Sequence, residues 1–321
     1  MDFELSDDQV ALAEGVAALC EGRFDIESVR AMEADGLDRA RWGELAETGV
    51  FSLCLAEDDG GVGLGWAEAA VVFEQLGRAL VPGPLVATTL AAGLIEGAAD
   101  GSTVVTTVPR SAGAAMVEHA AWADVVVISD DEGLWSVPTS ALGGADAHQP
   151  LDPLTPVRRV DALPQGDRIG DTAAADDWHQ RGAMLTAALQ LGIAVGATEL
   201  AVGYAKEREQ FGRPIGAFQA VKHRCADMIT RVEVLRAAVY AAGATLDGRG
   251  VDSPERAVSV AKVLASSAAA ACGKDCVQVH GGMGYTWEVD AHLFLKRAWV
   301  HDLAFGDGAE LAEDLAAGLV S

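Results

Sequence analysis

The chain has 321 residues, of which 50% are hydrophobic, and it carries a formal net charge of −25 at pH 7. This length can bury a substantial core and predicts more than one domain. The acidic balance argues against a nucleic-acid partner, because phosphate backbones would be repelled. No apolar run reaches membrane-spanning length without glycine or charge, so we expect a soluble protein without membrane contact.

The N-terminus and the cysteines indicate a compartment. The opening residues, MDFELSDDQ, are acidic and lack the basic stretch of a signal peptide. Five cysteines are scattered along the chain, and Cys272 and Cys276 share a helix face without a nearby second pair of ligands. We therefore expect reduced thiols, no metal site and a cytoplasmic location.

Residues 1–100 are predicted to form an N-terminal helical domain. A capping box that begins at Ser6 starts the first helix, and further helices are expected over 39–48 and around 72–80. The glycine-rich stretch 49–65 lacks the Lys-Ser/Thr pair of a phosphate-binding loop. It is interpreted as a structural loop.

Residues 101–172 change in pattern and predict a small middle β-domain. Short β-branched and apolar runs at 102–108, 124–129 and 134–137 are typical of strands. The Pro- and Gly-rich stretch 140–166 is expected to consist mostly of turns.

Residues 173–321 are predicted to form a helical bundle. Apolar residues recur at helical spacing in three successive stretches, and the lengths and short connections are typical of a four-helix bundle. These residues are Leu185 and Leu189, then Val232, Leu235 and Val239, then Val260, Val263 and Leu264. The expected fold class is therefore mainly α with a small middle β-domain.

A tight corner is expected between the first two helices of this bundle. Gly212 can end the first helix in a left-handed conformation, and Pro214 forbids its continuation. The corner presents Arg208, Gln210 and Phe211 together, and these residue types suit a planar ligand that carries phosphate. On spacing alone, a helix end with an exposed arginine is the simpler account.

Two long stretches resemble the signatures of one protein family. The first, REQFGRPIGAFQAVKHRCADM, begins at Arg208, and the second, CVQVHGGMGYTWEVDAHLFLKR, runs from Cys276 to Arg297. Both closely resemble signatures of the acyl-CoA dehydrogenase family, and they occur in the order expected for it. The resemblance covers nearly the whole chain and implies a three-domain architecture that ends in a four-helix bundle.

The resemblance implies that FAD lies across a subunit interface. In this family the neighbouring subunit holds part of the adenine and pyrophosphate end of the flavin. It does so through an Arg-x-x-Phe-Gly corner, a later Gln and a Gln-x-x-Gly-Gly segment. The matching positions here are Arg208, Gln210, Phe211, Gln219, Gln278, Gly281 and Gly282.

The contacts that each subunit supplies for its own flavin are degenerate in this chain. The family's Thr-Glu-Pro and Gly-Ser-Asp strand and loop have no match in residues 101–172. The Thr-x-Gln that follows the family's catalytic Glu-Gly aligns with Asp307 and Ala309. The resemblance thus implies a chain that keeps its contribution to a neighbour's flavin and has lost much of its own site.

The catalytic base is also missing at its usual positions. The family's reaction removes a proton alpha to a thioester carbonyl while a hydride leaves the beta carbon for the flavin, so a carboxylate must lie beside the alpha carbon. The two positions that the family uses for it align with Phe305 and Gly182, neither of which is acidic. Asp307 is the candidate if the alignment is shifted by a residue or two.

The chain is therefore interpreted as the short, catalytically degenerate subunit of a heteromeric enzyme. It resembles such subunits of the actinobacterial acyl-CoA dehydrogenases that oxidise steroid side-chain CoA thioesters. A larger partner would supply the base, the flavin-ring pocket and most of the acyl-CoA site. Two alternatives stay open: a self-sufficient homo-oligomeric flavoenzyme with an unconventional base, and a non-redox scaffold or binding protein on the same fold.

Overall fold

The computed structural model describes residues 5–111, 113–250 and 253–318, and these form two compact units. The first unit contains the described residues up to Ile26, Trp66–Val81 and the described residues from Ala183 onward. The second contains Glu27–Gly65 and Pro82–Gly182. Each unit is described by itself.

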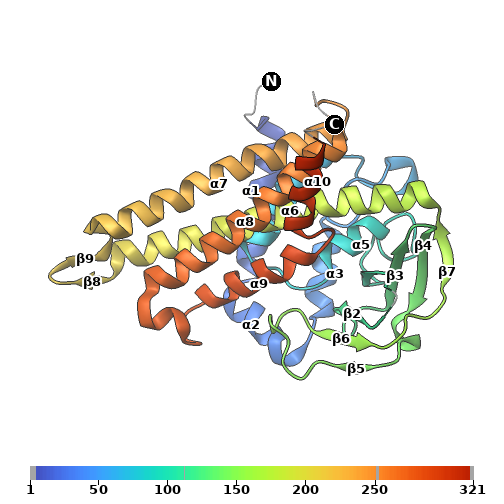
Figure 1. Ribbon diagram of the computed structural model, residues 1–321, viewed down its shortest axis with the longest axis horizontal. Coiled ribbons are helices and arrows are strands. Elements are labelled where there is room, and N and C mark those ends of the chain that lie inside the picture. The colour runs from blue at the N-terminus through green and yellow to red at the C-terminus, as the bar shows by residue number, and fades with distance from the viewer. Residues whose placement is uncertain (1–4, 112, 251–252, 319–321) are drawn as a thin grey trace. The chain divides into compact units, whose positions relative to one another are not determined.

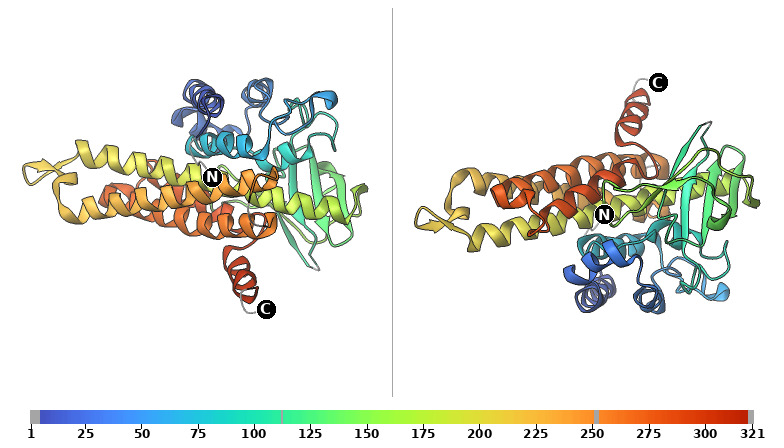
Figure 2. Two further views of the ribbon diagram at one scale, coloured as in Figure 1. Left: turned by 90° about the horizontal axis from the view of Figure 1, so that it is seen from above. Right: turned by 90° about the horizontal axis from the view of Figure 1, so that it is seen from below.

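The first unit is helical (Figure 1). The long helices α6 and α7 run antiparallel beside each other and are joined at one end by the β8–β9 hairpin, while α8 packs along α7 and α9 packs against α8 (Figures 1 and 2). Its helices are α1 (Asp7–Arg23), α4 (Trp66–Arg78), α6 (Thr172–Glu207, from Ala183 onward), α7 (Gln219–Leu246), α8 (Pro254–His280), α9 (Ala291–Leu303) and α10 (Gly308–Ala317).

Two glycines allow α4 and α6 to approach closely. A Cβ placed on Gly192 of α6 would lie 2.0 Å from the carbonyl oxygen of Glu74 and 2.5 Å from the nitrogen of Arg78. A Cβ placed on Gly77 of α4 would lie 2.1 Å from the carbonyl oxygen of Leu189. Neither position has room for a side chain, so glycine at both sets the spacing of the two helices.

Two carboxylates connect α4 to α7. Asp247, directly after α7, accepts hydrogen bonds from the first two N–H groups of α4, at 2.8 and 3.0 Å. Glu74, which is 4% exposed, accepts from the guanidinium of Arg236 and from the hydroxyl of Tyr240. A buried carboxylate is stable only when it is paired in this way, so these contacts fix α4 on the bundle.

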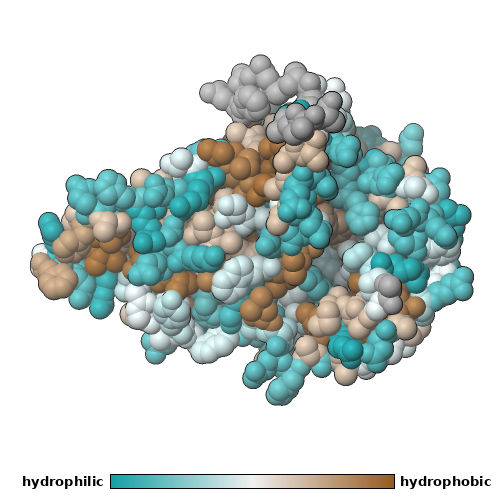
Figure 3. Space-filling model, viewed as in Figure 1, coloured by the Kyte–Doolittle hydropathy of each residue, from teal (hydrophilic) through white to brown (hydrophobic). Residues whose placement is uncertain are grey.

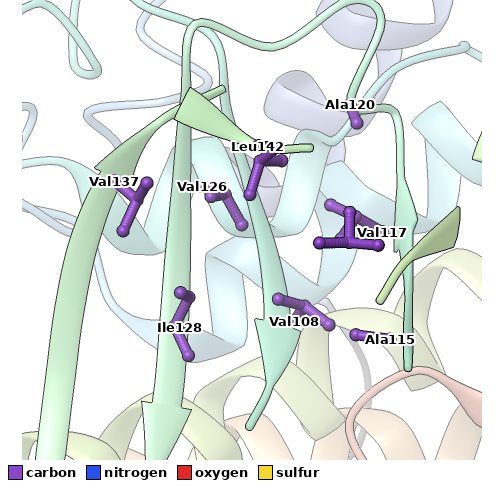
Figure 4. Close-up of a cluster of buried hydrophobic side chains, with 9 residues drawn as sticks. Val108, Ala115, Val117, Ala120, Val126, Ile128, Val137 and Leu142 are labelled. Atoms are coloured by element: carbon purple, nitrogen blue, oxygen red, sulfur yellow. The ribbon is translucent and has the colours of Figure 1, made fainter. Parts of the chain in front are cut away.

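The second unit combines three short helices with two small sheets. In one sheet the order is β1-β3-β4-β7, with β1 and β3 parallel and the other pairs antiparallel; the other sheet is antiparallel, in the order β2-β6-β5. Apolar side chains from both sheets form one core, including Val108, Val117 and Ile128 (Figure 4). The helices are α2 (Ile26–Asp35), α3 (Arg39–Glu47) and α5 (Leu85–Ala91), and the strands are β1 (Val105–Pro109), β2 (Ala115–Glu118), β3 (Val125–Asp130), β4 (Gly133–Pro138), β5 (Ala145–Asp146), β6 (Val157–Val160) and β7 (Asp167–Gly170).

The expected fold class is confirmed: the chain is mainly helical with a small β region. The capping box at Ser6 is present, and the helix predicted over 39–48 is α3. The stretch 140–166 consists mostly of turns and irregular structure, as expected, and also contains the short strands β5 and β6. The domain boundaries at residues 100 and 172 stay predictions.

Helix α6 is the one element among the described residues that is long and apolar enough to cross a membrane. However, 83% of its most apolar window is buried inside the protein. Such burial is typical of the core helix of a soluble protein, which has the same length and composition.

Candidate functional site

The predicted corner is a β-hairpin rather than a capped helix end. Helix α6 ends at Glu207, before the predicted stop, and β8 (Glu209–Gln210) pairs with β9 (Arg213–Pro214). Phe211 and Gly212 form the two-residue loop, with φ of 54° and 78°. Positive φ at both positions is typical of type I′ hairpins, so Gly212 is left-handed as expected but serves a strand turn.

Phe211 holds its ring in solvent. It is 93% exposed, and its left-handed backbone is unusual for a residue with a bulky side chain. Phe218 contacts it edge-to-face, with ring centroids 6.1 Å apart, and the guanidinium of Arg213 lies 4.2 Å from the centroid of Phe218. Figure 3 shows apolar colours at the end of the molecule where this hairpin lies. An exposed aromatic ring with this support is suited to stack on a planar group.

The same end of the bundle offers hydrogen-bond donors to an anion. Arg208 is exposed, and its guanidinium takes part in none of the ion pairs found among the described residues. Gln219 is the first residue of α7, and no side chain caps this helix end, whose preceding residue is Phe218. The free N–H groups at the start of a long helix attract anions, so this end suits a phosphate group.

The second predicted segment lies at the end of α8. Gln278 is exposed in the last turn, Gly281 follows the helix with φ of 63°, and Gly282 lies in the 3-10 helix η4 (Gly281–Tyr285). A Cβ on either glycine would meet nothing within 4 Å. Both glycines therefore leave open space that a ligand or another backbone can enter.

A stacked pair of rings joins the two segments. Tyr204 of α6, one turn before Arg208, stacks on His280 of α8 with ring centroids 4.2 Å apart, and its hydroxyl lies 3.8 Å from the sulfur of Met283. The structure thereby brings the hairpin and the Gln278–Gly282 segment to one end of the bundle. All seven predicted cofactor residues are exposed, so this chain alone does not enclose a ligand at these positions.

The two usual base positions offer no carboxylate. Gly182 is buried within α6, and Phe305 follows α9 with φ of 55°, a left-handed conformation like that of Phe211. Asp307 caps α10, because its carboxylate accepts from the N–H groups of Ala309 at 2.7 Å and Glu310 at 3.3 Å. The alternative base therefore has a structural role in this chain.

Sequence reasoning missed Lys262, which holds the end of α9 directly before Phe305. Its ammonium is fully buried and donates to the carbonyl oxygens of His301 at 3.0 Å and Asp302 at 2.8 Å. Burial lowers the pKa of Lys262 to about 8, although the carboxylates of Asp302 and Asp307 oppose this shift. A single lysine within the apolar run AVSVAKVLASSAA was the available signal.

Lys262 should make stability depend on pH in the alkaline range. Its folded pKa of about 8 lies below the ordinary 10.5, so the unfolded state binds more protons between these values and its contribution to the free energy of unfolding rises with pH there. The unfolding free energy of wild type minus that of Lys262→Met should grow by roughly 2 kcal/mol between about pH 7.5 and about pH 10. Urea unfolding of both proteins measures this difference, and a flat difference would contradict it.

The structure gives no candidate metal centre among the described residues. All five cysteines are free thiols, and burial raises the pKa of Cys20 and of Cys276 to about 12. Thiols with such pKa values are poor nucleophiles and poor metal ligands at neutral pH.

Comparison with known proteins places the chain in a family. The model of the acyl-CoA dehydrogenase C-terminal domain matches residues 177–320, and that of the N-terminal domain matches residues 6–102. Acyl-CoA dehydrogenase IpdE2 of Mycolicibacterium smegmatis is 37% identical over 310 residues, which cover 92% of this chain and 93% of that protein.

Solved structures agree in fold. A chain from the ChsE4–ChsE5 complex of Mycobacterium tuberculosis has a TM-score of 0.86 at 22% identity, covering 100% of this chain and 99% of its own. A chain from a variant of the Tcur3481–Tcur3483 steroid ACAD has a TM-score of 0.83 at 25% identity, covering 98% and 99%. With the family models and a relative of matching length, the chain belongs to the acyl-CoA dehydrogenase family.

Proposed function

We propose that this chain is the smaller subunit of a heteromeric, flavin-dependent acyl-CoA dehydrogenase, a cytoplasmic heterotetramer of two kinds of chain. The reaction is α,β-desaturation of an acyl-CoA thioester, and a steroid side-chain CoA ester is the substrate class we favour. The larger partner binds most of the acyl-CoA and supplies the catalytic carboxylate. The two structural neighbours, each from a pair of differently named proteins, support a partner of the same fold.

One observation carries this proposal: the seven residues predicted to contact flavin are all exposed, whereas the two predicted base positions hold Phe305 and Gly182. Bound FAD supplies an acceptor for the hydride that leaves the beta carbon of the substrate. Arg208 and the start of α7 would hold its pyrophosphate, and Phe211 would offer a ring to its adenine end. Gly281 and Gly282 leave room for the cofactor to approach the backbone.

The alternatives account less well for these features. A self-sufficient enzyme needs a base in this chain, but Asp307 caps α10 and would leave two N–H groups without that acceptor if it moved. A scaffold without redox chemistry gives no reason to keep an unpaired Arg208 and an exposed Phe211 in a left-handed backbone. Flavin content separates the three readings.

The isolated chain should bind little FAD, because it lacks the contacts that a subunit makes to its own flavin. Purified together with its larger partner, it should be yellow, with about one flavin per pair of chains. The absorbance spectrum and the flavin-to-protein ratio of each preparation measure this. A homo-oligomer that carries one tightly bound FAD per chain would refute the proposal.

Phe305→Glu should not restore dehydrogenation in the isolated chain. A base acts only when the alpha proton, the beta hydride and the flavin ring are aligned, and that alignment supplies most of the rate. A glutamate at this half-buried position would also be partly desolvated, which favours its neutral form. The variant is assayed with FAD, a panel of acyl-CoA thioesters and an artificial electron acceptor.

Turnover clearly above that of the wild-type chain would show that a complete site lacked only its base. The matched experiment removes the corresponding glutamate from the larger partner. That change should abolish the activity of the complex, because the proposal places the only base there.

A further inference from the structure

A groove of about 890 Å³ runs along the first unit, beside the β8–β9 hairpin that carries the proposed flavin contacts (the flavin corner). The end of α1, the end of α4, the second half of α6 and the segment from η4 into α9 line it. Its lining is mostly apolar. The apolar side chains include Phe24, Ile26, Leu80, Leu200, Val289 and Phe294.

Carboxylates dominate the charged part of the lining. They are Glu21, Asp25, Glu199, Glu207, Glu288 and Asp290. Among the described lining residues Arg78 is the one arginine or lysine, and it is paired with Glu199 at 2.7 Å. Glu21, Glu207 and Glu288 add negative charge beyond this pair, and their field repels phosphates and carboxylates. This charge disfavours a nucleotide, CoA or a free fatty acid and favours a cationic apolar occupant.

The dimensions suit a helix. The groove follows α6 from Gly196 to Glu207, which is about 16 Å, or three turns, at the rise of an α-helix. Recognition of an amphipathic helix by an apolar groove uses anchor side chains spaced over two to three turns. Carboxylates beside such a groove then select a helix that carries lysine or arginine next to its apolar face.

The groove is continuous with the proposed flavin corner. Tyr204, His280 and Met283 are among its lining residues, and the same three residues join the hairpin to the Gln278–Gly282 segment. Arg208 directly follows Glu207, which is a lining residue. A protein that holds a flavin against the corner is thus already beside the groove.

We propose that the groove receives an amphipathic helix of the larger subunit, with apolar side chains on its floor and lysine or arginine side chains against its carboxylates. The identity of the partner rests on the proposed function, whereas the chemistry of the occupant rests on the groove. The contact makes assembly depend on residues that do not touch the flavin.

Charge reversal tests this contact. Glu207 and Glu288 are exposed, so the double variant Glu207→Lys/Glu288→Lys should fold. Its dissociation constant for the purified larger subunit should rise at least about ten-fold, because like charges would face each other. Glu47→Lys/Glu313→Lys makes the same change in net charge at exposed positions outside the groove and should leave the constant within about two-fold.

Hydrogen exchange of the complex gives a second measurement. Amides of residues 17–26 and 196–207 should become protected when the larger subunit binds.

Equal dissociation constants for the groove variant and the wild type, or equal weakening by both double variants, would overturn the groove proposal. Protection confined to residues 208–219 would do the same.

The experiments distinguish failure of the groove proposal from failure of the proposed function. If the groove variant loses affinity but Arg208→Ala leaves flavin binding unchanged, the groove contact stands and the flavin role falls. If the groove variant binds the larger subunit normally while Arg208→Ala loses flavin, the flavin role stands and the groove contact falls. Absence of any complex with the larger subunit overturns both.

Discussion

Arg208→Ala should weaken FAD binding by the two-subunit complex about ten- to a hundred-fold, while assembly persists. Charge-assisted hydrogen bonds to phosphate are worth about 1.5–3 kcal/mol each, which corresponds to this range of affinities. The hairpin itself should survive, because its closing bond runs from the N–H of Ile215 to the backbone oxygen of Arg208, at 2.7 Å, and needs no side chain. Flavin titration of the apo-complex measures the affinity, and light scattering measures the assembly.

Two further variants make the result specific. Arg208→Lys should recover part of the affinity, since lysine keeps the charge but loses the forked geometry. Arg159→Ala removes another exposed arginine, on β6, and should leave flavin affinity unchanged. Equal flavin affinity in wild type and Arg208→Ala would show that the corner does not contact the cofactor.

Gly192→Ala should destabilise the protein by about 3 kcal/mol, because overpacking a tight contact forces backbone shifts. The added methyl group would lie 2.0 Å from the carbonyl oxygen of Glu74. The clash is with backbone on α4, so no side-chain rotation relieves it. Urea unfolding followed by circular dichroism measures the loss.

Gly203→Ala is the matched control, in the same helix. A Cβ there meets nothing within 4 Å, and alanine is the better helix former by about 0.5–1 kcal/mol. This variant should therefore be neutral or more stable. A Gly192→Ala protein that unfolds at the wild-type urea concentration would mean that α4 and α6 do not approach as closely as the structure indicates.

Local composition was sufficient for the buried strands of the larger sheet. The strands near 124–129 and 134–137 were predicted because their residues are β-branched and apolar over a short run, and β3 and β4 are found there. The strands β2, β5 and β6 are short and contain polar residues, so their structure depends on pairing with strands that are distant in the sequence. No local pattern reports such pairing.

The candidate site shows the same division. The residue types at Arg208, Phe211 and Gln278 were readable as motifs, but their exposure and the stack of Tyr204 on His280 depend on how α6 meets α8. The hairpin was missed because a two-residue loop with Phe at its first position is rare, whereas Asn or Gly is common there. Lys262 was missed because only the tertiary structure shows where the last carbonyl groups of α9 lie.

The loop at Phe211 lowers the stability of the isolated chain while it presents an exposed ring to a binding partner. A phenylalanine in a left-handed backbone costs free energy, and its 93% exposed ring returns little by burial within this chain. Random mutagenesis of the isolated chain, screened only for heat resistance, would therefore favour Asn or Gly at this position. The surviving clones would be more heat-resistant but would lack the aromatic ring of Phe211. Such a screen would select against a surface that the proposed larger subunit would contact, so directed evolution of this chain should be carried out in the proposed complex.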